Sequence, residues 1–176
     1  MGFGSSPVGD ITLNTQLSAE DRVKFQDTRV IRSLLAEAKV IAVVGLSAEP
    51  TKASNMVASY LQDEGYRVIP VTPRSGVILG EQTYPDLASI PFTVDIVDVF
   101  RPANEVSGII SASIAKGARA VWCQLRIIDL EASQKALDAG LQVVVDKCIK
   151  MEHGRFGGQL HWAGMNTEVI TAKRAR

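Results

Sequence analysis

Short apolar runs rich in β-branched residues recur along the chain and are separated by longer amphipathic segments. The runs lie at Val40–Val44, Arg67–Val71, Val94–Phe100, Ala120–Gln124 and Gln142–Asp146. They are almost continuously apolar instead of alternating with polar residues, which is typical of strands that are covered on both faces. The pattern therefore predicts a single α/β domain, with a doubly wound parallel sheet of five to six strands and flanking helices.

Three amphipathic segments between these strands have the length and the ending of helices. They are Ala53–Glu64, Ala103–Lys116 and Leu130–Ala139, followed immediately by Gly65, Gly117 and Gly140. Glycine most easily adopts the left-handed conformation that ends many helices. The segment Gly80–Tyr84, which precedes a turn at Pro85 and Asp86, is a candidate for one further edge strand.

The two ends of the chain differ from this alternating region. Residues 1–17 are expected to form a flexible tail. Ser18 begins a rough variant of a capping box, and the apolar face after it predicts a first helix over residues 18–38. The domain is then expected to span residues 18–152, and the glycine-rich residues 153–176 are expected to form an irregular C-terminal extension.

Composition limits the kinds of partner that we expect. The 19 basic and 19 acidic side chains give a formal net charge of zero, so a global electrostatic attraction to nucleic acid is missing. No apolar run approaches the roughly 18 residues of a membrane helix. Cys123 and Cys148 suggest neither a disulfide scaffold nor a zinc site, and no metal site is predicted. We expect a cytoplasmic monomer or homodimer that binds a small-molecule nucleotide, without nucleic-acid or membrane partners.

The loop after the first predicted strand has the residues of an anion-binding turn. The stretch VIAVVGLSAEPTKAS, from residue 40, has one glycine where the dinucleotide fingerprint has three. Glycine permits a tight turn, serine can cap the next helix, and the N-terminus of that helix favours phosphate. The alternative is a turn and cap that any α/β protein needs. The candidate binding residues are Gly45, Leu46, Ser47, Lys52, Ala53 and Ser54.

The second predicted strand ends without the acidic residue that binds the ribose of NAD. Thr72, Pro73 and Arg74 follow it instead. A carboxylate accepts hydrogen bonds from ribose hydroxyls, whereas a guanidinium binds phosphate, often through two parallel hydrogen bonds. The loop therefore favours a nucleotide with an additional phosphate on or near its ribose, either NADP or coenzyme A (CoA). The alternative for Arg74 is an exposed loop residue.

Two further strand ends contribute candidates at the same edge of the sheet. Phe100 ends the third strand and Arg101 follows it, and both are positioned to flank an adenine or a pantetheine arm. The alternatives are a core position for Phe100 and a solvated one for Arg101. Pro102 is predicted at the first position of the next helix, where its missing N–H costs nothing. Gln124 ends the fourth strand.

The quoted turn, together with RVIPVTPR, VDIVDVFRP, AVWCQ and VVVDKCIKMEH, resembles the small stand-alone CoA-binding proteins. Those proteins are similar to the amino-terminal CoA-binding domain of the succinyl-CoA synthetase alpha subunit. The resemblance covers about residues 30–153 and implies a Rossmann-like domain that binds CoA or an acyl-CoA at the strand ends. It implies that the first turn meets the pyrophosphate, that Thr72–Arg74 lie by the adenosine and its 3′-phosphate, and that Phe100–Pro102 close over the nucleotide. Arg126 departs from the family, because many members have glycine there.

The resemblance implies a carrier, sensor or accessory protein more than an enzyme. The synthetase alpha subunit needs a further domain with a phosphorylated histidine, for which this chain is too short. No catalytic arrangement can be placed around His153 or His161, and no catalytic residue is predicted. Two alternatives stay open, namely an NADP-linked or acyl-CoA-utilising enzyme and a pure interaction module.

Cys148 follows the last predicted strand and is expected near the ligand. Lys147 beside it is expected to lower the pKa of its thiol, which would permit a mixed disulfide with the CoA thiol. The alternative is a small packed residue at a strand end. Cys123 lies inside a predicted strand and is expected in the core.

Overall fold

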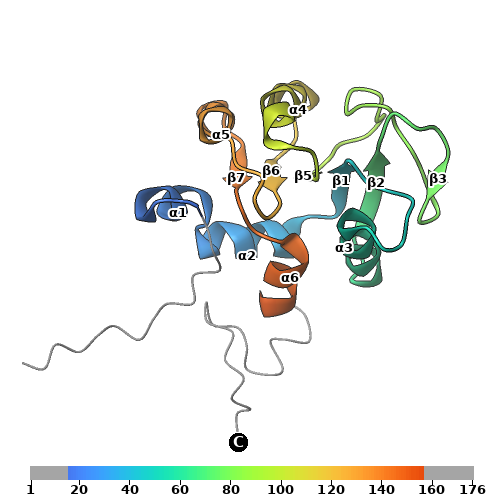
Figure 1. The fold of residues 1–176 in the computed structure, drawn as a ribbon, viewed down its shortest axis with the longest axis horizontal. Coiled ribbons are helices and arrows are strands. Elements are labelled where there is room, and N and C mark those ends of the chain that lie inside the picture. Colours follow the sequence, from blue (N-terminus) through green and yellow to red (C-terminus); the bar gives the residue numbers. More distant parts are fainter. Residues whose placement is uncertain (1–15, 157–176) are drawn as a thin grey trace, which may run out of the picture.

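The computed structural model describes residues 16–156, and its centre is a sheet of five parallel strands (Figure 1). The strands are β1 (Val40–Val44), β2 (Arg67–Val71), β5 (Ile96–Val99), β6 (Ala120–Cys123) and β7 (Gln142–Val144). Their order across the sheet is β2-β1-β5-β6-β7, so the strand order reverses between β1 and β5. The predicted fold class, a Rossmann-like doubly wound parallel sheet, is confirmed.

Helices cover both faces of this sheet, because the main strands are apolar on both sides. One layer contains α4 (Ala103–Lys116) and α5 (Leu130–Asp138), and the other contains α2 (Thr28–Glu37), α3 (Ala53–Asp63) and α6 (Ile149–Phe156) (Figure 1). Successive strand residues point to opposite layers. Val97 packs with Val106 of α4, whereas its neighbour Ile96 packs in the second core with Ile149 of α6.

Several predicted boundaries agree with the structure. The strands β1 and β2 and the helix α4 begin and end at the predicted residues. The predicted left-handed helix ends are confirmed, because Gly65, Gly117 and Gly140 have φ values of 96°, 72° and 89°. The third main strand is shorter than the predicted Val94–Phe100, since β5 loses residues at both ends.

The helix predicted over residues 18–38 is two helices, α1 (Ala19–Phe25) and α2. Asp27 starts the second one, because its side chain accepts a hydrogen bond from the backbone N–H of Arg29, as an N-cap does. The predicted cap at the start is confirmed, since the Ser18 hydroxyl accepts a backbone N–H bond from the first turn of α1. The two helices bury different faces, because Phe25 of α1 packs in the core on the α4–α5 side whereas Ile31 of α2 packs in the opposite core. Val23, which periodicity placed on the apolar face, is 78% exposed.

The ends of the described chain are more ordered than predicted. Leu17, predicted in the tail, is buried in the core on the α4–α5 side. The predicted irregular extension begins too early, because α6 continues past residue 152 with His153 inside it. Residues 1–15 and 157–176, with His161, lie outside the described residues. No helix in the described part of the chain is long and apolar enough to cross a membrane.

Between β2 and β5 the chain forms a small antiparallel hairpin. Its strands are β3 (Val77–Ile78) and β4 (Glu81–Gln82). The edge strand predicted at Gly80–Tyr84 is therefore wrong in extent and pairing, because Gly80, with a φ of 78°, lies in the hairpin turn. Tyr84 alone joins the main sheet, through a parallel bridge to Val71. It lies outside β2, where the third strand of a Rossmann sheet would stand.

Candidate functional site

The loops that follow β2, β1 and β5 are held together beyond the last strand residues. The backbone N–H of Gly45 donates to the oxygen of Val71 at 2.9 Å, and the N–H of Phe100 donates to the oxygen of Val44 at 2.9 Å. These bonds continue the parallel ladder, so the three loops start side by side. Open α/β sheets bind ligands at the carboxyl edge where the strand order reverses, which here lies between β1 and β5.

Gly45 is required both by its backbone conformation and by its neighbours. Its φ of 92° lies in the left-handed region that favours glycine. A Cβ at this position would lie 2.8 Å from Cδ of Arg101 and 3.2 Å from the backbone oxygen of Phe100. The turn after β1 therefore packs directly against the loop after β5, and a larger residue would push them apart.

Two buried polar side chains fix the turn between β1 and α3. The Ser54 hydroxyl accepts a hydrogen bond from the N–H of Ser47 at 3.1 Å, and the Asn55 amide donates to the oxygen of Ser47 at 2.8 Å. The Ser47 hydroxyl accepts from the N–H of Glu49 at 3.1 Å. Both hydroxyls keep their own proton for a ligand. The predicted helix cap by one of these serines is wrong, because Lys52 is the N-cap residue of α3 and makes no side-chain cap bond.

The N-terminus of α3 gives this edge a positive character. The first N–H groups of a helix have no acceptor within the helix, and the helix dipole is positive there. The Lys52 ammonium lies 3.9 Å from the carboxylate of Glu49, and an ion pair between two such exposed groups is weak. Ala53 is exposed beside it, whereas the Leu46 side chain is 2% exposed and belongs to the core. Leu46 can therefore offer a ligand only its backbone.

The loop after β2 presents a cation to solvent. The N–H of Thr72 donates to the oxygen of Tyr84 at 2.9 Å, which anchors the start of the loop. Pro73 and Arg74 beyond it are exposed. Within residues 16–156 the Arg74 guanidinium forms no ion pair. It can therefore bind a phosphate without first giving up a protein partner.

The loop after β5 contains an aromatic side chain and an arginine whose charge is already paired. Phe100 is half-buried and packs against the core on the α2–α3–α6 side. The Arg101 guanidinium donates to both carboxylate oxygens of Glu105, at 2.9 and 2.7 Å, and this contact lowers the pKa of Glu105. The aliphatic part of Arg101 lies over Gly45. Pro102 is the N-cap of α4, one residue before its predicted position in the helix.

Gln124 is joined to a buried carboxyl group that the sequence reading missed. Asp98 in β5 is fully buried, and its Oδ1 accepts a hydrogen bond from Nε2 of Gln124 at 2.7 Å. Among the described residues, Oδ2 of Asp98 has no hydrogen-bond partner. Burial raises the pKa of Asp98 from its ordinary value of 3.8 to about 7, although the Gln124 hydrogen bond lowers it. The signal in the sequence was a carboxylate inside an apolar strand.

The loop after β6 holds Arg126 in a strained backbone conformation. Its φ is 64°, in the left-handed region that glycine adopts most easily. The N–H of Arg126 donates to Oδ1 of Asp146 at 2.7 Å, and the N–H of Ile127 donates to the oxygen of Gln124 at 3.0 Å. These bonds close a tight turn at the carboxyl edge. A glycine at this position would adopt the same φ without strain.

Neither cysteine has the environment of a reactive thiol. Cys123 is fully buried, as expected for a core residue, and burial raises its pKa to about 12. Cys148 is half-buried, and burial raises its pKa despite hydrogen bonds from backbone N–H groups of α6. The predicted lowering of this pKa by Lys147 is wrong, because the Lys147 ammonium lies 3.6 Å from the carboxylate of Glu152 instead.

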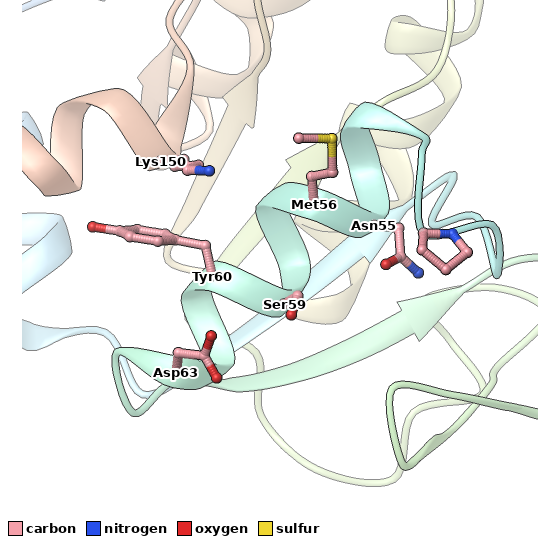
Figure 2. Close-up of a pocket in the computed structure, with 7 residues that line it drawn as sticks. Asn55, Met56, Ser59, Tyr60, Asp63 and Lys150 are labelled. Atoms are coloured by element: carbon pink, nitrogen blue, oxygen red, sulfur yellow. The ribbon is translucent and has the colours of Figure 1, made fainter.

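A surface hollow beside α3 adjoins the turn between β1 and α3, because Pro50 and Asn55 line it. It has a volume of about 390 Å³ and is lined by Pro50, Asn55, Met56, Ser59, Tyr60, Asp63 and Lys150 (Figure 2). Figure 2 shows Tyr60 projecting from α3 on the side where Lys150 of α6 lies, and the Lys150 ammonium is 5.3 Å from the centre of the Tyr60 ring. None of the predicted binding residues lines this hollow.

The fold and the edge define a class of protein, the Rossmann-like domains with a polar loop cluster at the carboxyl ends of parallel strands. Residues 39–154 match the family model of the CoA binding domain, and the chain belongs to that family. The resemblance inferred from the sequence motifs is thereby confirmed. The match spans all of the predicted binding residues, from Gly45 to Gln124.

Relatives of the chain include both single small proteins and part of a large enzyme. The uncharacterized protein YneT of Bacillus subtilis (strain 168) is 37% identical over 123 residues, which cover 70% of this chain and 91% of YneT. A hypothetical protein from Pyrococcus horikoshii OT3 has a similar structure, with a TM-score of 0.71, 38% identity and coverage of 73% of this chain and 91% of that one. The ADP-forming acetate–CoA ligase I of Archaeoglobus fulgidus is 35% identical over 68 residues, which are 39% of this chain and 10% of the ligase.

Proposed function

We propose that the protein binds CoA or an acyl-CoA across the carboxyl edge of β2, β1, β5 and β6, as a carrier, sensor or accessory protein without chemistry of its own. The observation that carries this proposal is the CoA binding domain match over residues 39–154, which includes every loop of the edge. Family membership supports CoA as the ligand. The choice between free CoA and an acyl-CoA, and the biological role, belong to the proposal.

The order of the loops suggests how the ligand would lie. Arg74, with no ion pair among the described residues, would take the 3′-phosphate, because a guanidinium binds phosphate with two donors. The pyrophosphate would meet the N–H groups at the start of α3, together with the hydroxyls of Ser47 and Ser54. The pantetheine arm would then pass Phe100 and bring the sulfur end towards Gln124, following the strand order β2-β1-β5-β6.

A binding role without catalysis is supported by the side chains at this edge. The polar side chains among the predicted binding residues are hydroxyls, cations and an amide, which bind anions and polar groups, and the two carboxylates beside them, Glu49 and Glu105, are paired with Lys52 and Arg101. His153 belongs to α6, where its Nδ1 lies 2.9 Å from the Tyr60 hydroxyl and burial lowers its pKa. It is therefore engaged in the helix layer on one face of the sheet.

Isothermal titration calorimetry with CoA, dephospho-CoA and NADPH tests this proposal. We expect CoA to bind most tightly, and dephospho-CoA to bind about tenfold more weakly because it lacks the phosphate that pairs with Arg74. Arg74→Ala should weaken CoA binding by a similar factor and leave dephospho-CoA binding unchanged. Arg119→Ala, which removes an arginine just before β6 at the opposite edge of the sheet, is the matched control and should change neither affinity.

Two outcomes would contradict the proposal. Binding of NADPH without binding of CoA would favour the oxidoreductase alternative. Equal affinity of wild type and Arg74→Ala for CoA would remove the 3′-phosphate role of the β2 loop, even if CoA binds.

A further inference from the structure

The pair formed by Gln124 and Asp98 connects the buried sheet to its open edge. The Nε2 end of the Gln124 amide donates to Oδ1 of Asp98 at 2.7 Å. The other end, Oε1, has no hydrogen-bond partner within residues 16–156. Gln124 follows the last residue of β6 at the carboxyl edge and is 4% exposed, so a ligand at this edge can contact only a small part of it.

Asp98 determines which end of that amide faces the edge. A carboxylate only accepts hydrogen bonds, so an ionised Asp98 holds the Nε2 end and leaves Oε1 outwards. A protonated carboxyl has an O–H that needs an acceptor, and Oε1 of Gln124 is the acceptor within reach of Oδ1. Rotation of the amide about its last side-chain bond then satisfies the proton and turns the NH₂ group outwards.

We propose that Gln124 reads the sulfur end of the bound ligand, and that the proton on Asp98 sets whether it does so as a donor or as an acceptor. With Asp98 protonated, the outward NH₂ donates to the carbonyl oxygen of an acyl-CoA thioester. With Asp98 ionised, the outward oxygen accepts from the thiol of free CoA. The ligand class favoured at low pH is therefore the acyl-CoA. This inference rests on the proposed function.

Burial and the hydrogen bond from Gln124 determine the pKa of Asp98, and no neighbouring charge contributes to it. Its register neighbours are Val43 on β1 and Trp122 on β6, which do not titrate. The thiols of Cys123 and Cys148 are the titratable groups whose own pKa values Asp98 affects. The other titratable groups of the helix layer on this side include Arg32, Glu37, Lys52, Tyr60, Glu152 and His153. None of them contributes to the raised pKa of Asp98, which has burial as its cause and the Gln124 bond as its opposing influence.

Calorimetry of the full chain with CoA and acetyl-CoA at pH 6, 7 and 8 tests the inference. The ratio of the two affinities removes the titration of the phosphates, which both ligands share. We expect the preference for acetyl-CoA over CoA to fall about three- to tenfold from pH 6 to pH 8, the effect of one hydrogen bond gained or lost. Asp98→Asn cannot titrate and should make the ratio independent of pH.

Asp95→Asn is the matched control for that variant. Asp95 precedes the same strand at the opposite edge, where its carboxylate accepts from the N–H groups of Lys39 and Val40. This variant should retain the pH dependence of the wild type. A constant ratio in the wild type, with both ligands bound, would overturn the inference and leave the proposed function intact. Failure of both ligands to bind would overturn the proposed function and, with it, the inference.

Nuclear magnetic resonance of the free protein provides a second measurement that needs no variant. The Cγ of Asp98 and the side-chain amide of Gln124 should change their chemical shifts with one common midpoint between pH 5 and pH 8. An Asp98 carboxyl that titrates while the Gln124 amide stays unchanged would overturn the proposed reorientation.

Discussion

Replacing Asp98 by asparagine should change how the stability of the protein depends on pH. The two side chains have nearly the same shape, and asparagine keeps an oxygen that can accept the Gln124 hydrogen bond at the position of Oδ1. The substitution removes the ability to ionise inside the sheet and places an NH₂ group at the position of Oδ2, which has no partner among the described residues. The cost of that NH₂ group does not depend on pH, so the pH dependence of the stability difference isolates the cost of burying a charge at this position.

The magnitude follows from the raised pKa of Asp98, about 7 in the folded protein against an ordinary value of 3.8. Between these values the folded state binds more protons than the unfolded state, so the free energy of unfolding falls as the pH rises, and the loss is complete above about pH 7. The folded and the ordinary pKa of Asp98 differ by about three units, which corresponds to a total loss of about 4 kcal/mol in the free energy of unfolding. About 2 to 3 kcal/mol of this falls between pH 5 and pH 8.

Urea unfolding followed by circular dichroism at pH 5, 6, 7 and 8 measures this effect. The free energy of unfolding of Asp98→Asn, relative to wild type, should rise by about 2 to 3 kcal/mol between pH 5 and pH 8. His153 has a pKa lowered by burial and contributes a slope of opposite sign. It is present in both proteins, so its contribution cancels in the difference.

Asp86→Asn is the control for a carboxylate that stays ionised in both states. Hydrogen bonds from Ser89 lower the pKa of Asp86, so its effect on stability lies below pH 5. The difference between this variant and wild type should be constant from pH 5 to pH 8. An equally constant difference for Asp98→Asn would refute the reasoning, because it would mean that Asp98 does not change its protonation in this range.

Three further predictions concern residues at the carboxyl edge. Gly45→Ala should destabilise the protein by about 2 to 4 kcal/mol in urea unfolding, through its positive φ and the 2.8 Å approach to Arg101. Gly65→Ala, with a similar φ and no atom within 4 Å of the new Cβ, should cost only the backbone part, and equal losses would disprove the clash. Arg126→Gly should raise the stability by up to about 1 kcal/mol because its φ of 64° suits glycine, and a lower melting temperature would contradict this. Cys148 should react slowly with a thiol reagent at pH 7 and form no adduct with oxidised CoA, as judged by mass spectrometry, because burial raises its pKa.

The strands and their layers could be predicted because each is a local apolar run bounded by a turn residue. The strand β1 ends just before Gly45, and β2 ends just before Thr72 and Pro73, so composition marks both boundaries. The hairpin of β3 and β4 could not be predicted in this way. Its strands have two residues each, too few for an alternating pattern, and Tyr84 is fixed only by its distant partner Val71.

The position of the candidate residues at one edge of the sheet could be predicted, but the contacts among them could not. That strand ends share an edge follows from topology, which assigned Arg74 and Gln124 to the same side of the sheet. The approach of Arg101 to Gly45 joins two loops that are far apart in the sequence. The hydrogen bond from Asn55 to Ser47 joins α3 to the loop that precedes it. Sequence patterns carry no information on such pairs, because each residue alone fits an ordinary surface or cap position.

The free-energy cost of burying the Asp98 carboxyl group is the strongest physical reason to assign this residue a role beyond the fold. An apolar side chain of similar size would fill the same position in β5 without a desolvation penalty, and its neighbours Val97 and Val99 are of that kind. The carboxyl group is nevertheless bonded to Gln124, a buried side chain that extends to the edge. Buried ionisable side chains that lower the stability of a protein are found mainly at functional sites. The hydrogen bond to Gln124 therefore suggests a functional role for Asp98. If Asp98→Asn is more stable at pH 8 and loses the pH dependence of its ligand preference, the same proton accounts for both the lost stability and the discrimination between acyl-CoA and CoA.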